Sequence, residues 1–508
     1  MFFSKPPISV RQSQIFEEVA LEISKNYPEI IWFADDTVDA TSEAGLTSTS
    51  VVKSWTSHIF NAMTITDNNT DANKATINHN NKKYIELERS LHSILCFYLL
   101  LPDKCDQEAA YQYWIQAQTG SFILSKESFY ELRSLCKQLT PVDIKVIEAS
   151  LIYSDLGKTP IARENAKKIP EIKIESSDHD DFIDSLYSHD SSIIQQVLPS
   201  FKKLDPQVQQ RIKEQHNIVP LHWGHVFHLE GGVNMFKRLL DRLSSYIPKT
   251  DIDTSTIESL IKHAFLIQVC DVAASRAHQD LNGFIAFNQI SYLGYKAIWE
   301  TITELYTGKI DPKQVLLTIT NKKAKQLGYI TATDDINITT TLSKEKLFTL
   351  TRLGAFLRLS NEEEGRSLLQ QAETNTNTWE ESDWKIVEEI FGLDSGINKW
   401  SCNPTYMPTV VGSLFNSTTN NVEKYRKALD GLLLLAKLLK KYQNDGKATL
   451  DSPLCFNSLA KQLQKATDSQ LSWLFNIKTF DEALLHYTEK NEVEINFPKL
   501  SPKLSSTN

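Results

Sequence analysis

The spacing of apolar side chains is the feature that most constrains the fold of this chain. Between residues 84 and 101, four of them recur every three or four positions and so share one helical face: Leu87, Leu91, Leu95 and Tyr98. Pro102 follows and ends the pattern. Gly and Pro number only 17 each in 508 residues, whereas turn-rich β architectures need more of both. The sequence therefore predicts an all-α fold.

Similar patterns, bounded by capping residues or helix breakers, predict helices along most of the chain. They lie at 10–33 (ending near Pro28), 84–101, 108–119, 128–138, 140–153, 181–198, 205–216, 233–246, 255–278, 284–306, 312–326, 343–359, 361–374, 380–391, 422–442 and 456–475. Residues 330–341 alternate weakly, which predicts a short strand pair or a loop. We expect an N-terminal helix with polar loops over 1–82, a helical core over 83–308, a C-terminal helical lobe over 309–498 and a tail over 499–508.

Composition excludes several classes of protein. Acidic residues outnumber basic ones by 63 to 54, for a net charge of −9, so we expect no nucleic-acid binding. The start of the chain lacks a signal-peptide pattern, and the best apolar run, 432–439, is short and contains Lys437, so we expect no membrane span. Six scattered cysteines without C-x-x-C spacing predict reduced, buried thiols in a cytoplasmic protein.

The most informative motif for chemistry is Tyr153-Ser154-Asp155-Leu156-Gly157-Lys158, at the end of an apolar helix. Gly157 is expected to adopt a left-handed turn conformation. Asp155 is then placed to hold a divalent cation while Lys158 neutralises a phosphate oxygen. The alternative is a helix end with a surface Asp–Lys pair.

Two histidine-containing segments follow. His179-Asp180 lies in an acidic cluster, and imidazole with carboxylate is a usual ligand mixture for Zn, Mn, Fe or Mg. His222, His225 and His228 recur every third residue, with Glu230 two positions on. On a helix these histidines share a face, where they either surround a substrate or cover the edge of the core.

The long apolar helix at 255–278 carries Asp271 among hydrophobic residues, and Arg276 and His278 follow. Asp271 and His278 are seven positions apart and share a helical face. A carboxylate on a buried stripe is costly unless it is paired or binds a metal. The alternatives are therefore a metal ligand or a buried ion pair.

Together these motifs resemble the HD-domain superfamily of metal-dependent phosphohydrolases, all-α proteins in which His and Asp side chains from successive helices hold a metal. The match runs from the D-L-G-K turn at Asp155 through His179-Asp180 and the 221–230 segment to Asp271. The stretch from 145 to 300 also looks like a little-studied helical family of fungi and bacteria with the same turn. Ser154 stands where the HD pattern has its first paired histidine, and His92 is the candidate for the upstream helical histidine.

The resemblance implies a hydrolase that acts on a nucleotide or another small phosphorylated molecule. A divalent metal (Mn, Fe, Mg or Zn) is expected on Asp155, His179, Asp180, Asp271 and His92. The expected catalytic residues are Lys158, His225 and His228, and the expected substrate-binding residues are His222, Glu230, Arg276 and His278.

Two other functions remain open at this point. Ser154 is a poor metal ligand, so the chain is alternatively a catalytically degenerate HD-like protein that binds a ligand or partner; its Asn-rich loops and acidic, Lys-rich surface are also compatible with a bacterial effector delivered to a host cytosol. A metal-dependent lyase or oxygenase on the same fold is the third possibility, because fold does not fix reaction.

Overall fold

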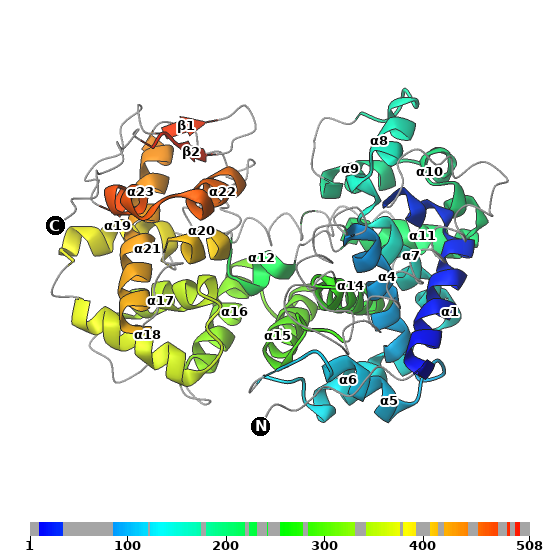
Figure 1. Cartoon of the computed structure of the whole chain (residues 1–508), viewed down its shortest axis with the longest axis horizontal. Coiled ribbons are helices and arrows are strands. Elements are labelled where there is room, and N and C mark those ends of the chain that lie inside the picture. The colour runs from blue at the N-terminus through cyan, green and yellow to red at the C-terminus, as the bar shows by residue number, and fades with distance from the viewer. Residues whose placement is uncertain are drawn as a thin grey trace, which may run out of the picture. The chain divides into compact units, whose positions relative to one another are not determined.

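The structure is a computed structural model of the whole chain and is helical nearly throughout its described parts (Figure 1). It describes residues 10–33, 85–119, 122–173, 179–218, 223–230, 241, 254–277, 283–330, 342–375, 379–392, 407–414, 421–444, 456–475, 485–487 and 493–497. The chain divides into two compact units. The first comprises 1–220 and 252–296, and the second 221–251 and 297–508.

The first unit is built from α-helices joined by short turns and 3₁₀ segments. Its elements are α1 (Val10–Asn26), η1 (Pro28–Phe33), α4 (Ile85–Leu100), α5 (Gln107–Ile115), α6 (Lys126–Lys137), α7 (Pro141–Tyr153), η3 (Leu156–Lys158), α8 (Pro160–Lys167), α9 (His179–Tyr187), α10 (Ser191–Val197), η4 (Pro199–Lys203), α11 (Pro206–Ile218) and α14 (Thr254–Ala274). Helix α15 (Gln289–Tyr306) contains the boundary between the units.

The second unit contains further helices and one short antiparallel strand pair. Its elements are α12 (Trp223–Phe227), α16 (Pro312–Gln326), α17 (Lys344–Phe356), α18 (Glu362–Asn375), α19 (Glu381–Phe391), α20 (Met407–Ser413), α21 (Asn421–Asn444), α22 (Asn457–Lys465), α23 (Asp468–Phe475), β1 (Leu485–Tyr487) and β2 (Val493–Ile495). Leu485 pairs with Ile495 in the strand register. The predicted all-α class is confirmed.

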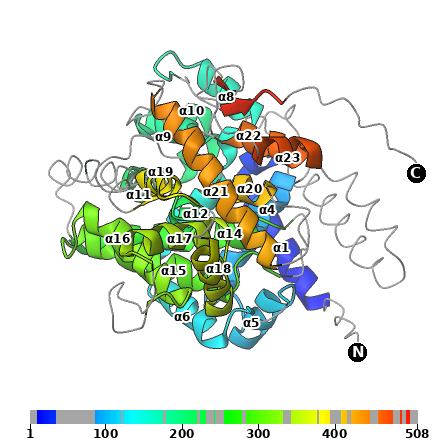
Figure 2. The ribbon, with the colours of Figure 1, turned by 90° about the vertical axis from the view of Figure 1, so that its left-hand side faces the viewer.

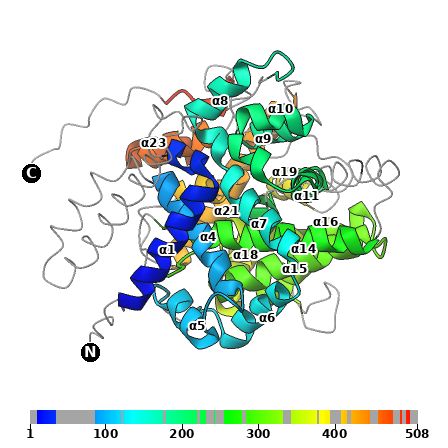
Figure 3. The same cartoon turned by 90° about the vertical axis from the view of Figure 1, so that its right-hand side faces the viewer.

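Helix α4 lies at the centre of the first unit, against α1, α7 and α14 (Figures 1 and 3). Its predicted apolar face is buried, with Leu87, Leu91 and Leu95 at most 2% exposed. Cys96 and Cys270 are buried as expected. The apolar face of α4 therefore anchors the helices around it.

Helix α7 begins and ends where the sequence predicts. The Thr140 side chain accepts a hydrogen bond from the Asp143 backbone N–H, and the Asp143 carboxylate accepts one from the Thr140 N–H. This reciprocal capping satisfies two backbone donors that a helix start leaves open. Asp143 also meets His263 Nε2 of α14 at 3.1 Å, which joins the start of α7 to α14.

In the second unit, α21 lies against α18, α19 and α20 (Figures 1 and 2). Arg352 of α17 is completely buried there. Its Nε and Nη2 donate to the Leu229 carbonyl, and its Nη1 donates to the Phe391 carbonyl at 3.1 Å. A buried guanidinium is tolerated because backbone carbonyls accept its protons.

Two of the predicted segments lie almost entirely outside the described residues. The helix predicted at 233–246 has only residue 241 among the described residues, and the strand or loop predicted at 330–341 is described only at residue 330. Within the described part of the chain, no helix has the length and apolar character needed to cross a bilayer. The predicted domain bounds stay a prediction.

Glu29 of η1 is a buried acid that attaches η1 to η4. One carboxylate oxygen accepts the Ser200 backbone N–H, and the other is buried with no partner among the described residues. Burial raises the pKa of Glu29 because an ionised carboxylate loses its hydration there. As the pH rises, the folded protein must hold an ionised carboxylate in a buried position, and its free energy of unfolding therefore falls.

We expect Glu29→Gln, which cannot ionise, to gain stability relative to the wild type as the pH rises. The two proteins should be closest near pH 4.5, because a raised folded-state pKa costs stability only above the unfolded value. Urea unfolding from pH 4.5 to 8 measures the difference. Glu18→Gln, at an exposed position of α1, is the control and should show a constant offset. A constant offset for Glu29→Gln as well is the contradicting result.

Candidate functional site

The predicted turn after α7 forms the base of a charged cluster in the first unit. Helix α7 ends at Tyr153, Ser154 continues its hydrogen bonding, and Asp155 begins the short segment η3. Leu156 is completely buried. Because the apolar residues on both sides are fixed in the core, the Asp155 carboxylate is held at 15% exposure.

Gly157 is required in this turn for a different reason from the one predicted. Gly283, Gly308 and Gly328 have positive φ among the described glycines, and Gly157 does not, so the left-handed prediction is wrong. A Cβ on Gly157 would instead lie 2.8 Å from the His179 carbonyl oxygen. The absence of a side chain thus lets the backbone of α9 approach η3.

That close approach brings His179 to Asp155. His179 Nε2 lies 3.5 Å from Asp155 Oδ1, while Lys158 Nζ lies 2.9 Å from Asp155 Oδ2. Lys158 also reaches Glu86 of α4 at 3.1 Å. The predicted residues Asp155, Lys158 and His179 are therefore neighbours in space.

Arg89 and Glu86 of α4 are residues of this cluster that the sequence alone did not indicate. The Arg89 guanidinium bonds to Glu86 at 3.1 Å and lies 3.9 Å from Asp271 Oδ1 of α14. The charge of Asp155 also acts strongly on it. The available signal is an arginine one turn before His92 on a largely apolar helix, but Asp155 and Asp271, which act on it, are distant in sequence.

The pKa shifts show how these charges support one another. Burial alone raises the pKa of Asp155, but Lys158 and then Arg89 outweigh it, so the net shift is downward. For Lys158, burial lowers the pKa, and the nearby carboxylates, Asp155 first, reverse the shift. Arg89 behaves in the same way, with a raised pKa. All three groups are therefore held in their charged forms.

Asp271 is less buried than the sequence predicted. Its side chain is 40% exposed, so the prediction of a carboxylate enclosed by hydrophobic residues is wrong. The neighbouring Ala273 and Ala274 are buried, and Asp271 lies at the edge of that apolar surface. An ion pair with Arg89 at partial exposure accounts for its charge without a metal.

His92 is in the core. It is fully buried, its ring packs 4.6 Å from the Phe284 ring, and burial lowers its pKa to about 3. It is neutral at physiological pH. The residue of α4 that interacts with Asp155 and Asp271 is Arg89, so the expected contribution of His92 to a metal site stays a prediction that its aromatic surroundings do not support.

Other predicted site residues belong to parts of the chain where less is described. His222 and His278 lie outside the described residues, as do the side chains of Asp180 and His225. Arg276 is exposed. His228 and Glu230 belong to the second unit, where the Glu230 carboxylate accepts the Met407 backbone N–H at 2.8 Å. The predicted roles of all these residues stay predictions.

The described donors do not fit a divalent metal. Both oxygens of Asp155 face nitrogen groups, and Asp271 faces a guanidinium. Within the described residues, no three or more His, Cys, Asp and Glu side chains are gathered in a way that could hold a metal ion. An ion at this position also meets repulsion from Lys158 and Arg89, whose charges the shifted pKa values preserve.

Comparison with known proteins matches part of the chain to a family model. Residues 57–218 match the model of a family of unknown function, DUF6829. This covers about a third of the chain and includes Arg89, Asp155, Lys158 and His179, but not Asp271. Searches of curated proteins and of solved structures gave no match. The HD-domain resemblance stays a prediction from the sequence.

Gly157→Ala should destabilise the first unit. The added Cβ meets backbone atoms of His179, which cannot rotate away, so we expect a loss of about 1–3 kcal/mol in urea unfolding. Gly412→Ala in α20 is the matched control, because a Cβ there meets nothing within 4 Å. A Gly157→Ala protein as stable as the wild type would show that the approach of α9 is not fixed by this contact.

Asp155→Asn should cost about 3 kcal/mol of unfolding free energy at pH 7, because it leaves Lys158 and Arg89 without their most buried partner. A lowered folded-state pKa stabilises the protein above the unfolded value and loses that effect as the pH falls. The difference from the wild type should therefore shrink below about pH 4. Chemical unfolding at pH 7 and pH 3 tests both statements, and a loss of equal size at the two pH values contradicts them.

Proposed function

We propose that this chain is a non-catalytic HD-like helical protein that acts by binding a ligand or partner. Its charged cluster then stabilises the first unit instead of hydrolysing a phosphoester. One observation carries the proposal: the two carboxylates expected to share a metal each face a fixed cation. Lys158 lies 2.9 Å from Asp155, and Arg89 lies 3.9 Å from Asp271.

The charges of the cluster support this assignment. Three carboxylates (Asp155, Glu86 and Asp271) surround two permanent cations (Arg89 and Lys158), with His179 beside Asp155. Opposite charges at these distances compensate the cost of partial burial. Lys158 and Arg89 already place two positive charges beside these carboxylates. A divalent ion would add two more, so it must displace the two side chains to bind. Among the described side chains of the cluster, the negative and positive charges thus nearly balance.

A metal-dependent phosphohydrolase is the second candidate. The observation in its favour is that Asp155 and His179 lie 3.5 Å apart, with Lys158 beside them to neutralise a phosphate. Solvent also reaches the cluster, since Lys158 is 26% and His179 30% exposed. This candidate requires Lys158 and Arg89 to move away from the carboxylates when the ion binds.

Metal analysis separates the two candidates. The full chain is treated with a chelator, incubated with Mn²⁺, Fe²⁺, Mg²⁺ or Zn²⁺, and desalted; metal content and thermal midpoint are then measured. We expect no stoichiometric metal and a thermal midpoint that neither metal nor chelator changes.

Asp271→Asn should lower the free energy of unfolding by only about 0.5–1 kcal/mol, because the Asp271 side chain of its ion pair is 40% exposed. Glu300→Gln, which removes a comparably exposed pair with Lys322, is the matched control.

The opposite result would overturn the non-catalytic proposal in favour of the metal-dependent phosphohydrolase. It consists of one or two metal ions per chain that Asp155→Asn and Asp271→Asn both lose, together with metal-dependent hydrolysis of p-nitrophenyl phosphate. Glu300→Gln should keep both properties in that case.

A further inference from the structure

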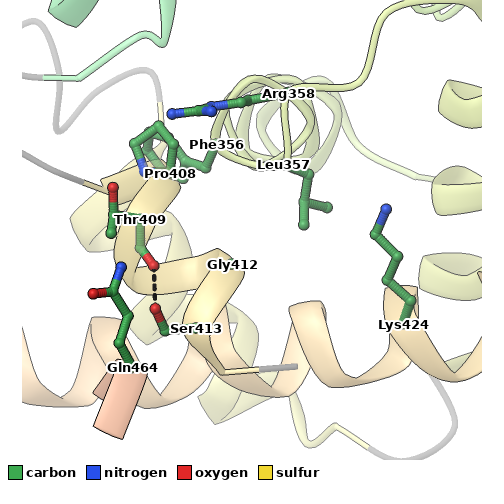
Figure 4. Close-up of a pocket in the computed structure, with 9 residues that line it drawn as sticks. All are labelled: Phe356, Leu357, Arg358, Pro408, Thr409, Gly412, Ser413, Lys424 and Gln464. Carbon is green, nitrogen blue, oxygen red and sulfur yellow. Dashed lines mark hydrogen bonds between the residues drawn. The ribbon is translucent and has the colours of Figure 1, made fainter. Parts of the chain in front are cut away.

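The second unit contains a cavity of about 380 Å³ that no predicted site residue lines. It lies where the end of α17 meets α20, with α21 and α22 contributing one side chain each (Figure 4). Phe356, Leu357 and Pro408 form an apolar part of its wall. A volume of this size suits a small molecule.

Two cations from different elements line this cavity. Arg358 follows the end of α17, and Lys424 belongs to the first turn of α21. The described lining residues include no acid. Cations beside an apolar wall favour a ligand that combines a negative charge with an apolar body.

Uncharged polar groups complete the wall. Thr409, Ser413 and Gln464 lie together on one side of the cavity (Figure 4). The Ser413 hydroxyl donates to the Thr409 carbonyl at 2.7 Å, as it does in a continuing helix. The Thr409 hydroxyl and the Gln464 amide are further hydrogen-bonding groups for an anion and for the polar atoms next to it.

The backbone of Arg358 adopts a conformation that is unusual for a residue other than Gly. Its φ is +57°, in the left-handed region. The Arg358 N–H bonds to the Ala355 carbonyl, and the Leu359 N–H to the Gly354 carbonyl, which is the helix-ending motif that normally has Gly at this position. Arginine costs about 1 kcal/mol more than Gly in that conformation. Strained residues of this kind concentrate at ligand sites.

Gly412 keeps the cavity open. It lies within α20, where Gly is less favourable than Ala, and a Cβ there would meet no atom within 4 Å. A larger side chain at this position would extend into open space. Gly412 therefore offers a way to fill the cavity without disturbing the packing around it.

We propose that this cavity binds a small organic anion, with a carboxylate or phosphate between Arg358 and Lys424 and an apolar body against Phe356, Leu357 and Pro408. The site lies outside the charged cluster and does not depend on the function of that cluster. Phosphate and carboxylate share the chemistry of a compact anion, and the ligands used in the test distinguish them.

The test is binding of phenyl phosphate, benzoate and neutral benzyl alcohol to the full chain, measured by calorimetry and ligand-observed NMR. We expect saturable binding of at least one anion and at least tenfold weaker binding of benzyl alcohol. Tighter binding of phenyl phosphate than of benzoate assigns a phosphate ligand, and the reverse assigns a carboxylate. Failure of both anions to bind, or equal binding of benzyl alcohol, would overturn the proposal.

Variants locate the binding. Arg358→Gly should weaken it at least tenfold while the thermal midpoint stays or rises, because glycine relieves the left-handed backbone; loss of binding then cannot be due to unfolding. Gly412→Leu should weaken it as strongly by filling the space. Arg366→Gln is the charge-matched control: Arg366 is 70% exposed, pairs with Glu362 and does not line the cavity. Unchanged affinity in both Arg358→Gly and Gly412→Leu would place the anion elsewhere and overturn the assignment.

Discussion

The interaction on which the first unit depends is the set of ion pairs around the Arg89 guanidinium. Arg89 projects from the central helix α4 and interacts with Asp155 after α7 and with Asp271 on α14. Three segments that are far apart in the sequence thus share one fixed charge. Without the guanidinium, the partly buried carboxylates would lower the free energy of unfolding. The apolar faces bring the helices together, and the charges restrict how they meet.

The sequence predicts the local features of this fold well. The capping residue Thr140, the end of α7 at Tyr153 and the buried face of α4 are all confirmed. Each depends on residues within a few positions of one another, where periodicity and capping chemistry decide the structure. The all-α class follows from such local signals, because short apolar repeats and few helix breakers are visible without knowing any tertiary contact.

The candidate site was less predictable because its decisive contacts are not local. Asp155, Lys158 and His179 were found from their motif, but the motif does not reveal that Arg89 lies beside them. The motif predicts a left-handed backbone at Gly157, whereas glycine is needed there because the His179 backbone lies where a side chain would be. Asp271 was expected inside because its neighbours in sequence are apolar, yet its own direction on α14 leaves it 40% exposed.

The contact between Gly157 and the His179 backbone has a consequence for how such a site can change. The two segments are brought together by main-chain packing, so the distance between Asp155 and position 179 does not require attraction between their side chains. Substitutions at those two positions change the charges of the turn and alter its stability, but the main-chain contact between η3 and α9 does not involve their side chains. The backbone arrangement of the turn and the charges that it presents are therefore set by different residues, so the charges can change by substitution without a new path of the chain.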